Sequence, residues 1–363
     1  MSAVRIALAG YGHTGPQLAR VIDDAPSTVL VAIFDTDPRH RAAAARNHPS
    51  VAIARALDEC LDDPSIDAVI VATPASTHHP VALAALRAGK HILVETPFVM
   101  DLRHGAELDR VAREAGLVLA TGHTYLYDAG IGHMREHVET SQLGDLLYLR
   151  CERLSWGLGH SEMNALWNLA PHDVAILLHI LAADPSAVTA HGATSNRHDV
   201  EDVAFLALEF TDGPIAHIHV SRLDPTRVRQ LTAVGSTCSL RYKLTDDGPR
   251  IWVHERRSDD GLGSRSNSRT PQSGCQPWEP SADTVAAPQA QCEDFARAIR
   301  ERTAPVADAA MGLRVTNVLQ AASASLAYGG RPVEVPNLAR VGQAEARPAP
   351  YRAAVLLPDA PVA

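Results

Sequence analysis

The sequence contains very little lysine. Lys90 and Lys243 are the only lysines among 33 basic residues, and the excess of acidic residues gives a formal net charge of −9 at pH 7. A chain with this balance offers no basic patch to nucleic acid or to an anionic membrane, so neither is expected as a partner. Any catalytic ammonium group would have to come from one of those two positions.

Cysteine is also rare and follows no ligand spacing. The five cysteines are scattered and form no Cys-x-x-Cys pair (Cys60, Cys151, Cys238, Cys275, Cys292). They predict reduced thiols, with neither a disulfide framework nor a metal site. The longest apolar stretch, residues 174–183, is too short to span a bilayer. Met1 leads directly into the first apolar run, so no signal peptide is expected, and the reduced thiols suggest a cytoplasmic protein.

The first glycine-rich segment has the features of a dinucleotide site. An apolar run at residues 4–9 precedes a Gly-x-Gly-x-x-Gly turn, and a helical segment with an early proline follows it (Gly10, Tyr11, Gly12, His13, Thr14, Gly15, Pro16). The three glycines allow the tight turn, the approach of backbone to a pyrophosphate, and close packing of helix on strand. The helix N-terminus then faces the anion. The alternative is a glycine-rich turn in another kind of α/β protein. The apolar run before the turn and the helical segment after it make this alternative less favoured.

An acidic residue stands where such a site needs one. The second apolar run, residues 29–34, ends in Asp35, twenty residues after Gly15. A carboxylate there accepts hydrogen bonds from the ribose hydroxyls and repels a 2′-phosphate, so NAD is favoured over NADP as cofactor. Arg39 is the nearby residue that softens this preference.

The order of predicted elements indicates an α/β protein with two kinds of sheet. In residues 1–124, buried runs alternate with helices, which predicts a doubly wound parallel sheet of the Rossmann type. In residues 125–336, alternating runs between polar turns predict an α+β domain with a largely antiparallel open sheet. An apolar helix over 171–183 is expected to lie buried between the domains. Residues 256–283 are expected to form a mobile loop, and 337–363 a tail without a core.

Further motifs resemble those of the glucose-fructose oxidoreductase, inositol dehydrogenase and MocA (Gfo/Idh/MocA) family. They are ATPASTH at 72–78, AGKHILVE at 88–95, TGHTY at 121–125, LGD at 143–145 and NALWNLAPHD at 164–173. The resemblance covers residues 4–335. It implies an N-terminal NAD(P) domain, a C-terminal sheet domain that often builds a dimer or tetramer, and hydride transfer to or from a sugar or polyol carbon.

The resemblance also implies where several residues lie. Thr73, Pro74 and His78 are expected along the cofactor, and Glu95 on the nicotinamide side, at the ends of strands where open α/β sheets bind ligands. Tyr125, just after the last strand of the parallel sheet, is a further candidate for cofactor contact.

The residue after this glutamate departs from the family pattern. Most family dehydrogenases carry lysine there, where it bonds the substrate hydroxyl and stabilises negative charge on oxygen, whereas this chain has Thr96. Loss of one such donor typically costs ~100- to 1,000-fold in rate. A cis Thr96–Pro97 bond would preserve the backbone turn without the chemistry. Tyr125, Tyr127 and His160 are alternative sources of the missing group, although ordinary packing or solvent exposure is favoured for each.

His172 is the remaining candidate for general acid–base catalysis. It follows Pro171 in the expected first turn of the apolar helix, where the positive helix end disfavours an imidazolium, so a neutral imidazole able to accept a proton is expected. Asn168, four residues earlier, stands where many relatives have aspartate; its amide orients a hydroxyl but does not titrate. A packing or capping histidine is the alternative. The predicted catalytic set is Glu95, Thr96, Asn168 and His172.

Three functions are compatible with these features. An NAD-dependent oxidoreductase acting on a sugar, cyclitol or related polyol is preferred. The missing lysine favours two alternatives: an epimerase- or lyase-like enzyme with tightly held NAD and no net redox change, and a non-enzymatic NAD-binding regulator. The expected convergence of Glu95, Asn168 and His172 on one pocket disfavours the regulator.

Overall fold

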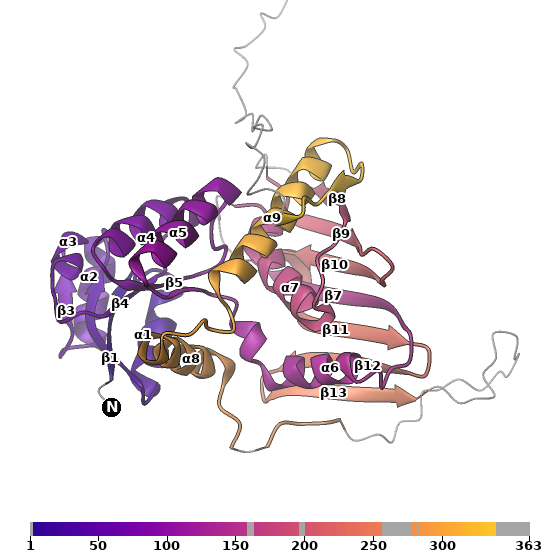
Figure 1. The fold of residues 1–363 in the computed structure, drawn as a ribbon, viewed down its shortest axis with the longest axis horizontal. Helices are drawn as coiled ribbons and strands as arrows, with labels where there is room; N and C mark the ends of the chain where they lie inside the picture. The colour runs from indigo at the N-terminus through magenta and orange to yellow at the C-terminus, as the bar shows by residue number, and fades with distance from the viewer. Residues whose placement is uncertain (1–2, 158–162, 196–199, 256–276, 282, 339–363) are drawn as a thin grey trace, which may run out of the picture.

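The computed structural model describes residues 3–157, 163–195, 200–255, 277–281 and 283–338. Two sheets with their covering helices lie side by side, and the helices from the end of the chain run between them (Figure 1). Most of the predicted loop at 256–283, nearly all of the predicted tail, and His160 lie outside the described residues.

The N-terminal sheet is parallel and doubly wound, as predicted. Its strand order is β3-β2-β1-β4-β5-β6, and each pair is parallel. The strands are β1 (Val4–Ala9), β2 (Thr28–Phe34), β3 (Ala52–Ala54), β4 (Ala68–Val71), β5 (His91–Val94) and β6 (Leu119–Thr121). The order reverses between β1 and β4, and open α/β sheets bind ligands beyond the carboxyl ends of the strands at such a point.

Helices cover both faces of this sheet and end where local signals predict. They are α1 (Gly15–Asp24), α2 (Pro38–Asn47), α3 (Asp58–Leu61), α4 (His78–Arg87) and α5 (Leu102–Ala115), with 3-10 turns η1 (Ala75–Thr77) and η2 (Thr124–Tyr127). In α5, the Asp101 carboxylate accepts a hydrogen bond from the Arg103 backbone N–H, and Gly116 ends the helix in the left-handed region at φ 65°. Both ends of α5 agree with the sequence-based expectation.

The C-terminal sheet is largely antiparallel, also as predicted. Its order is β13-β12-β11-β7-β10-β9-β8-β14, and only β7 and β10 pair in parallel among the described strands. The strands are β7 (Leu146–Trp156), β8 (Ala187–Ala193), β9 (Val203–Glu209), β10 (Ile215–Ser221), β11 (Leu223–Gly235), β12 (Cys238–Thr245), β13 (Gly248–Glu255) and β14 (Val333–Glu334).

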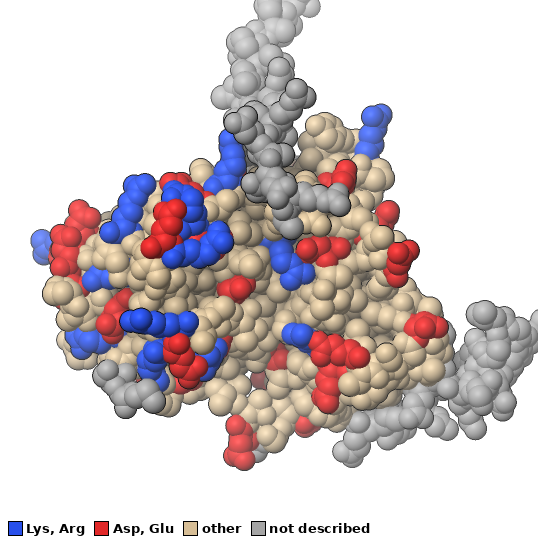
Figure 2. All heavy atoms as spheres, viewed as in Figure 1, with Lys and Arg blue, Asp and Glu red and all other residues tan. Residues whose placement is uncertain are grey.

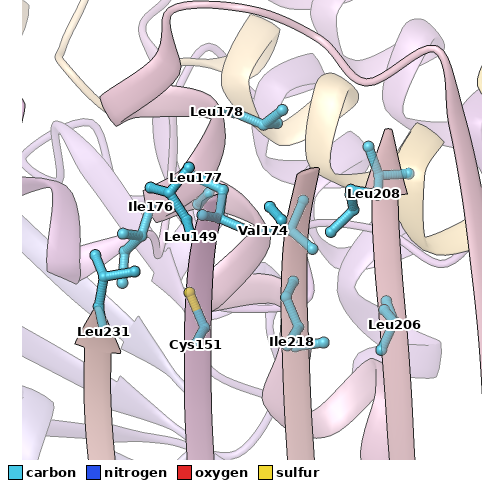
Figure 3. Packing of buried hydrophobic residues seen from close by; sticks show 14 of the residues in the cluster. Leu149, Cys151, Val174, Ile176, Leu177, Leu178, Leu206, Leu208, Ile218 and Leu231 are labelled. Carbon is cyan, nitrogen blue, oxygen red and sulfur yellow. The ribbon is translucent and has the colours of Figure 1, made fainter. Parts of the chain in front are cut away.

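Three helices cover one face of this sheet: α6 (Ala129–Glu139), α7 (Ala165–Leu181) and α9 (Ala309–Ala327). Alternate strand residues point toward α7, among them Leu149, Cys151 and Leu231, and meet Val174 and Leu177 of the helix (Figure 3). The opposite face of the sheet has no covering helix in the described chain, and several large apolar side chains on it are exposed (Tyr148, Phe205, Ile215).

The apolar helix begins earlier than predicted. α7 starts at Ala165, because the Asn164 side chain caps it by accepting a hydrogen bond from the Trp167 backbone N–H at 3.0 Å. Pro171 therefore lies inside the helix, where it removes one main-chain hydrogen bond, and not at its first turn. The predicted start at residue 171 is wrong, whereas the prediction of a largely buried helix is confirmed.

The last part of the chain completes the first sheet's core. Phe295 of α8 (Ala287–Glu301) is fully buried in the cluster that contains Ile6 and Leu8 of β1. The backbone N–H of Thr121, at the end of β6, donates to the carbonyl of Ala307. The division of the chain at residue 124 stays a prediction, but the two halves share core residues.

Four cysteines lie buried as free thiols, and Cys275 is outside the described residues. No helix in the described chain has the length and apolar character needed to cross a membrane. Acidic and basic side chains are interspersed over the face shown in Figure 2.

Candidate active site

The glycine turn between β1 and α1 has the shape of a phosphate cradle. Gly10 has φ +104°, and a Cβ there would collide with the carbonyl of Ala72 at the end of β4. Gly12, in contrast, has no protein atom nearer to the position of a Cβ than His40 Cε1 at 3.7 Å. No side chain caps the start of α1, which therefore stays open to a bound pyrophosphate. His13 and Thr14 are exposed at the tip of the turn.

Asp35 follows β2 directly and is held rigidly. Its carboxylate accepts hydrogen bonds from the backbone N–H groups of Tyr11 and Asp37, both at 2.7 Å, and His40 Nδ1 lies 3.2 Å from it. The Tyr11 ring itself is buried. Arg39, the residue expected to soften the cofactor preference, forms an ion pair with Asp37 at 2.6 Å and is otherwise exposed.

His78 connects two loops at the carboxyl edge of the sheet. Its Nε2 lies 2.8 Å from the carbonyl oxygen of Thr73, and its Nδ1 lies 2.8 Å from that of Pro97. The ring is buried, and burial lowers its pKa although the carbonyls act to raise it. Thr73 also accepts a hydrogen bond from Thr77 through its hydroxyl. His78 thus fixes the loops after β4 and β5, and direct cofactor contact by Thr73, Pro74 and His78 stays a prediction.

Glu95 extends from the end of β5 into a tightly packed position. A Cβ at Gly122 would lie 2.7 Å from Glu95 Oε2, so only glycine lets the carboxylate sit there. The Thr96 backbone N–H donates to the same oxygen at 3.2 Å. Burial outweighs this hydrogen bond and raises the pKa of Glu95 to about 7.

Thr96 and His172 meet across the two domains. Thr96 Oγ1 lies 3.4 Å from His172 Nε2, and the Thr96–Pro97 peptide bond is cis. His172 lies well inside α7, so the expected effect of a helix N-terminus does not apply. Its pKa is instead lowered well below the usual range by burial and by the nearby charges of Arg153, His123 and Arg229. A neutral imidazole is therefore retained, but for a different reason.

Asn168 and Tyr125 lie close to this histidine in the fold. Asn168 is one helical turn before His172 on the same side of α7 and is partly exposed. The Tyr125 ring packs edge to face on His172 with ring centroids 5.2 Å apart. Its hydroxyl accepts a hydrogen bond from Arg153 at 3.0 Å. Tyr125 thus contacts the proposed base directly.

Arg153 was not identified from the sequence. This buried residue of β7 donates to both carboxylate oxygens of Asp173 at 2.8 and 2.9 Å, and its guanidinium lies over the Tyr125 ring at 4.5 Å. An isolated arginine in an alternating strand gives no local signal of such a role. The Asp173 carboxylate next to His172 in sequence was the only available hint.

His123 was also missed as a site residue. It is fully buried between β6 and η2, and neither ring nitrogen has a hydrogen-bond partner among the described residues. Burial lowers its pKa to about 4. His123 is therefore a second neutral imidazole beside His172.

Neither lysine reaches this region. The Lys90 ammonium is buried and donates to the carbonyls of Asp63 and Ile66, at 2.6 and 2.9 Å. Lys243 is exposed on β12. The positive charge near His172 therefore comes from arginine.

Comparison with known proteins places the chain in a family. A family model described as "Oxidoreductase family, NAD-binding Rossmann fold" matches residues 4–123, and the "GFO/IDH/MocA C-terminal domain" matches residues 131–241. The chain belongs to the Gfo/Idh/MocA oxidoreductase family. The resemblance seen in the sequence motifs is thereby confirmed.

Individual relatives agree with this assignment. The 1,5-anhydro-D-fructose reductase of Ensifer adhaerens is 31% identical over 52% of this chain and 61% of its own length. The UDP-N-acetylglucosamine 3-dehydrogenase of Acidithiobacillus ferrooxidans is 32% identical over 62% of this chain and 70% of its own. The crystal structure of GenD2 from gentamicin A biosynthesis in complex with NAD superposes with a TM-score of 0.77 and 25% identity, covering 93% of this chain and 97% of that one.

Replacing Glu95 with glutamine should stabilise the cofactor-free protein in alkaline solution. The folded-state pKa of about 7 lies above the ordinary value of 4.5, so between these values the folded state keeps a proton that the unfolded state has lost. Stability therefore falls as pH rises through this window, and the glutamine variant escapes that loss. Chemical denaturation at about pH 8 should show the variant more stable by about 1–3 kcal/mol, with no gain near pH 4.

The control is Glu136→Gln, which removes an exposed carboxylate on α6. A Glu95→Gln gain that is independent of pH, or equal to the control, would rule out a buried carboxyl of raised pKa.

Proposed function

We propose that this chain is an NAD-dependent oxidoreductase that transfers hydride to or from a carbon of a sugar, cyclitol or related polyol. The proposal rests on the contact between Thr96 and His172. This contact lies beside Glu95, at the same edge of the sheet as the glycine turn. It unites an N-terminal site suited to a dinucleotide with a neutral base from the C-terminal domain. Several relatives are named for activity on sugars or inositols, which supports the substrate class.

The described residues fit the cofactor. The open space at Gly12 and the uncapped start of α1 suit the pyrophosphate, and the oriented carboxylate of Asp35 suits a free ribose hydroxyl. Bound NAD supplies a hydride acceptor, or its reduced form a donor. Arg39 is paired with Asp37, which reduces its availability to a 2′-phosphate and supports NAD over NADP.

His172 handles the proton in this proposal. In the oxidation direction, the substrate hydroxyl gives its proton to His172 Nε2 as its carbon loses hydride and becomes a carbonyl; the reverse reaction returns both. The low pKa of His172 keeps the imidazole unprotonated near pH 7, as a proton acceptor must be before the reaction. The Thr96 hydroxyl and the Asn168 amide orient the reacting oxygen, which the family's lysine would bind.

Titration calorimetry on the intact protein tests the cofactor assignment. NAD should bind at least about tenfold more tightly than NADP, which corresponds to 1.4 kcal/mol, because Asp35 repels the extra phosphate. Similar affinities would contradict the NAD preference. If neither dinucleotide bound, the whole proposal would fail.

The absorbance of the purified protein in the reduced-nicotinamide band separates the preferred function from its alternatives. Exchangeable cofactor with substrate-dependent reduction supports the dehydrogenase. Cofactor that survives purification and does not exchange with added NAD would favour an enzyme that catalyses no net redox change. The observation that supports this alternative is the neutral Thr96 in place of lysine.

Replacing His172 with alanine should abolish most turnover while leaving NAD binding intact. Loss of a general base typically lowers the rate by about 100- to 10,000-fold. The measurement is NADH formation with a panel of sugars and inositols, beside calorimetry with NAD. His104→Ala, at an exposed position on α5, is the matched control. Unchanged turnover in the His172 variant would remove this residue from the mechanism.

We further propose that the uncovered face of the C-terminal sheet forms a homodimer or homotetramer. Ile215 and Tyr148 lie directly opposite on β10 and β7 and are 52% and 45% exposed, and Phe205 on β9 is 41% exposed. Neighbouring apolar side chains on one sheet face are typical of an interface.

The cytoplasmic location expected from the cysteines remains part of the proposal.

Introducing a charge at Phe205 should dissociate this assembly. Sedimentation velocity should give a dimer or tetramer for the wild-type protein and a smaller species for Phe205→Glu, because a buried unpaired carboxylate is strongly unfavourable. Tyr328→Glu, at an exposed position after α9, should leave the mass unchanged. A monomeric wild-type protein would contradict the proposal.

A further inference from the structure

Arg229 presents a positive charge to the active site without an anionic partner. On β11 it lies directly opposite Arg153 of β7, and the next pair on the same face is Leu231 with Cys151. Residues opposite one another on adjacent strands point to the same side of a sheet. Leu231 and Cys151 point toward α7 (Figure 3), so Arg229 lies on the sheet face that α7 covers. His172 is part of this helix.

The one carboxylate of this cluster is already occupied. Both oxygens of Asp173 accept hydrogen bonds from Arg153, which leaves that arginine fully paired. Arg229, which is half-buried, makes a 3.4 Å hydrogen bond to the adjacent Val228 carbonyl, and it forms no ion pair within the described chain. Like charges at opposite positions of neighbouring strands are unfavourable, so an anion bound beside Arg229 would relieve this repulsion.

Arg229 also lies close enough to His172 to influence its charge state. Burial, and then the charge of Arg153, lowers the pKa of Arg229, and Arg229 in turn contributes to the lowered pKa of His172. Arg153, Arg229 and Asp173 together carry one net positive charge beside the proposed base. A guanidinium with free N–H groups binds planar carboxylates and phosphates with paired hydrogen bonds.

We infer that Arg229 binds an anionic group of the substrate, so that the preferred substrate is an acidic sugar or polyol bearing a carboxylate or a phosphate. This inference rests on the proposed function, because it assumes that substrate binds next to Thr96 and His172. Arg229 is then a residue of substrate specificity. The hydride is still lost from a neutral carbinol carbon elsewhere on the molecule.

Calorimetry with a matched set of ligands tests this inference on the full-length protein saturated with NADH. The probes are D-glucose, D-glucuronate and D-glucose 6-phosphate, which differ at one end of the sugar. At least one anionic probe should bind about tenfold or more tightly than glucose, and the probe that does so identifies carboxylate or phosphate as the group recognised. Arg229→Gln should weaken that binding by about 10- to 100-fold, in line with loss of a charge-assisted hydrogen bond, without changing glucose or NADH binding.

Two further variants complete the test. Arg229→Lys keeps the charge and should retain part of the preference, which a purely structural role for the arginine would not predict. Arg241→Gln removes an exposed arginine from the opposite face of β12 and should change nothing. The inference is overturned if glucose binds as well as both anions, if no anion binds at millimolar concentration, or if Arg229→Gln keeps the preference. Failure to bind NADH would instead overturn the proposed function.

Discussion

The ion pair between Arg153 and Asp173 determines the geometry of the candidate site. It joins the centre of β7 to α7 through two hydrogen bonds, with both side chains almost fully buried. Breaking such a pair by removing one partner typically costs about 3–5 kcal/mol, because the other charge is left uncompensated. Asp173 is adjacent to His172, so the pair also fixes the rotation of α7 that turns the imidazole toward Thr96. The same guanidinium holds Tyr125 against the histidine ring.

This network also explains the protonation of the site. Two cations near a buried imidazole oppose a third positive charge, and burial acts in the same direction, so His172 stays neutral. Glu95 has no cation among the causes of its shifted pKa, and burial alone favours its protonated form up to about pH 7. The imidazole is therefore neutral near pH 7, whereas the Glu95 carboxyl group is about half protonated there. The fixed charge near the imidazole is therefore that of the two arginines and Asp173.

The features that could be predicted from the sequence are those with local signals. Asp35 follows its strand at the expected spacing, Asp101 and Gly116 terminate α5, and both sheet types follow from the alternation of elements. The start of α7 was missed because Pro171 resembles a residue of the first helical turn, whereas the capping signal of Asn164 stands seven residues earlier. The expectation of a neutral His172 was right for a reason that the structure replaces.

The arginines could not be predicted in the same way. Whether Arg229 points to the core or to solvent depends on the register of β11 against β7, and the irregularity in that pairing between Leu223 and Val228 shifts it. A slip of β11 by one residue would place the Arg229 guanidinium on the opposite face, away from that of Arg153. Only the folded sheet determines that they converge on α7.

The position of these cations matters for the chemistry. A lysine at position 96 would extend from the loop after β5 and reach the reacting oxygen, where its charge stabilises the transition state more than the ground state. Arg153 and Arg229 come from the sheet, and the first of them is saturated by Asp173. A charge that stands away from the reacting atoms stabilises bound substrate and transition state nearly equally, which improves binding and selects among substrates without accelerating the chemical step. Under the proposed function, with Thr96 in place of the family's lysine and an unpaired arginine on β11, the charges of this site would therefore act on specificity more than on rate.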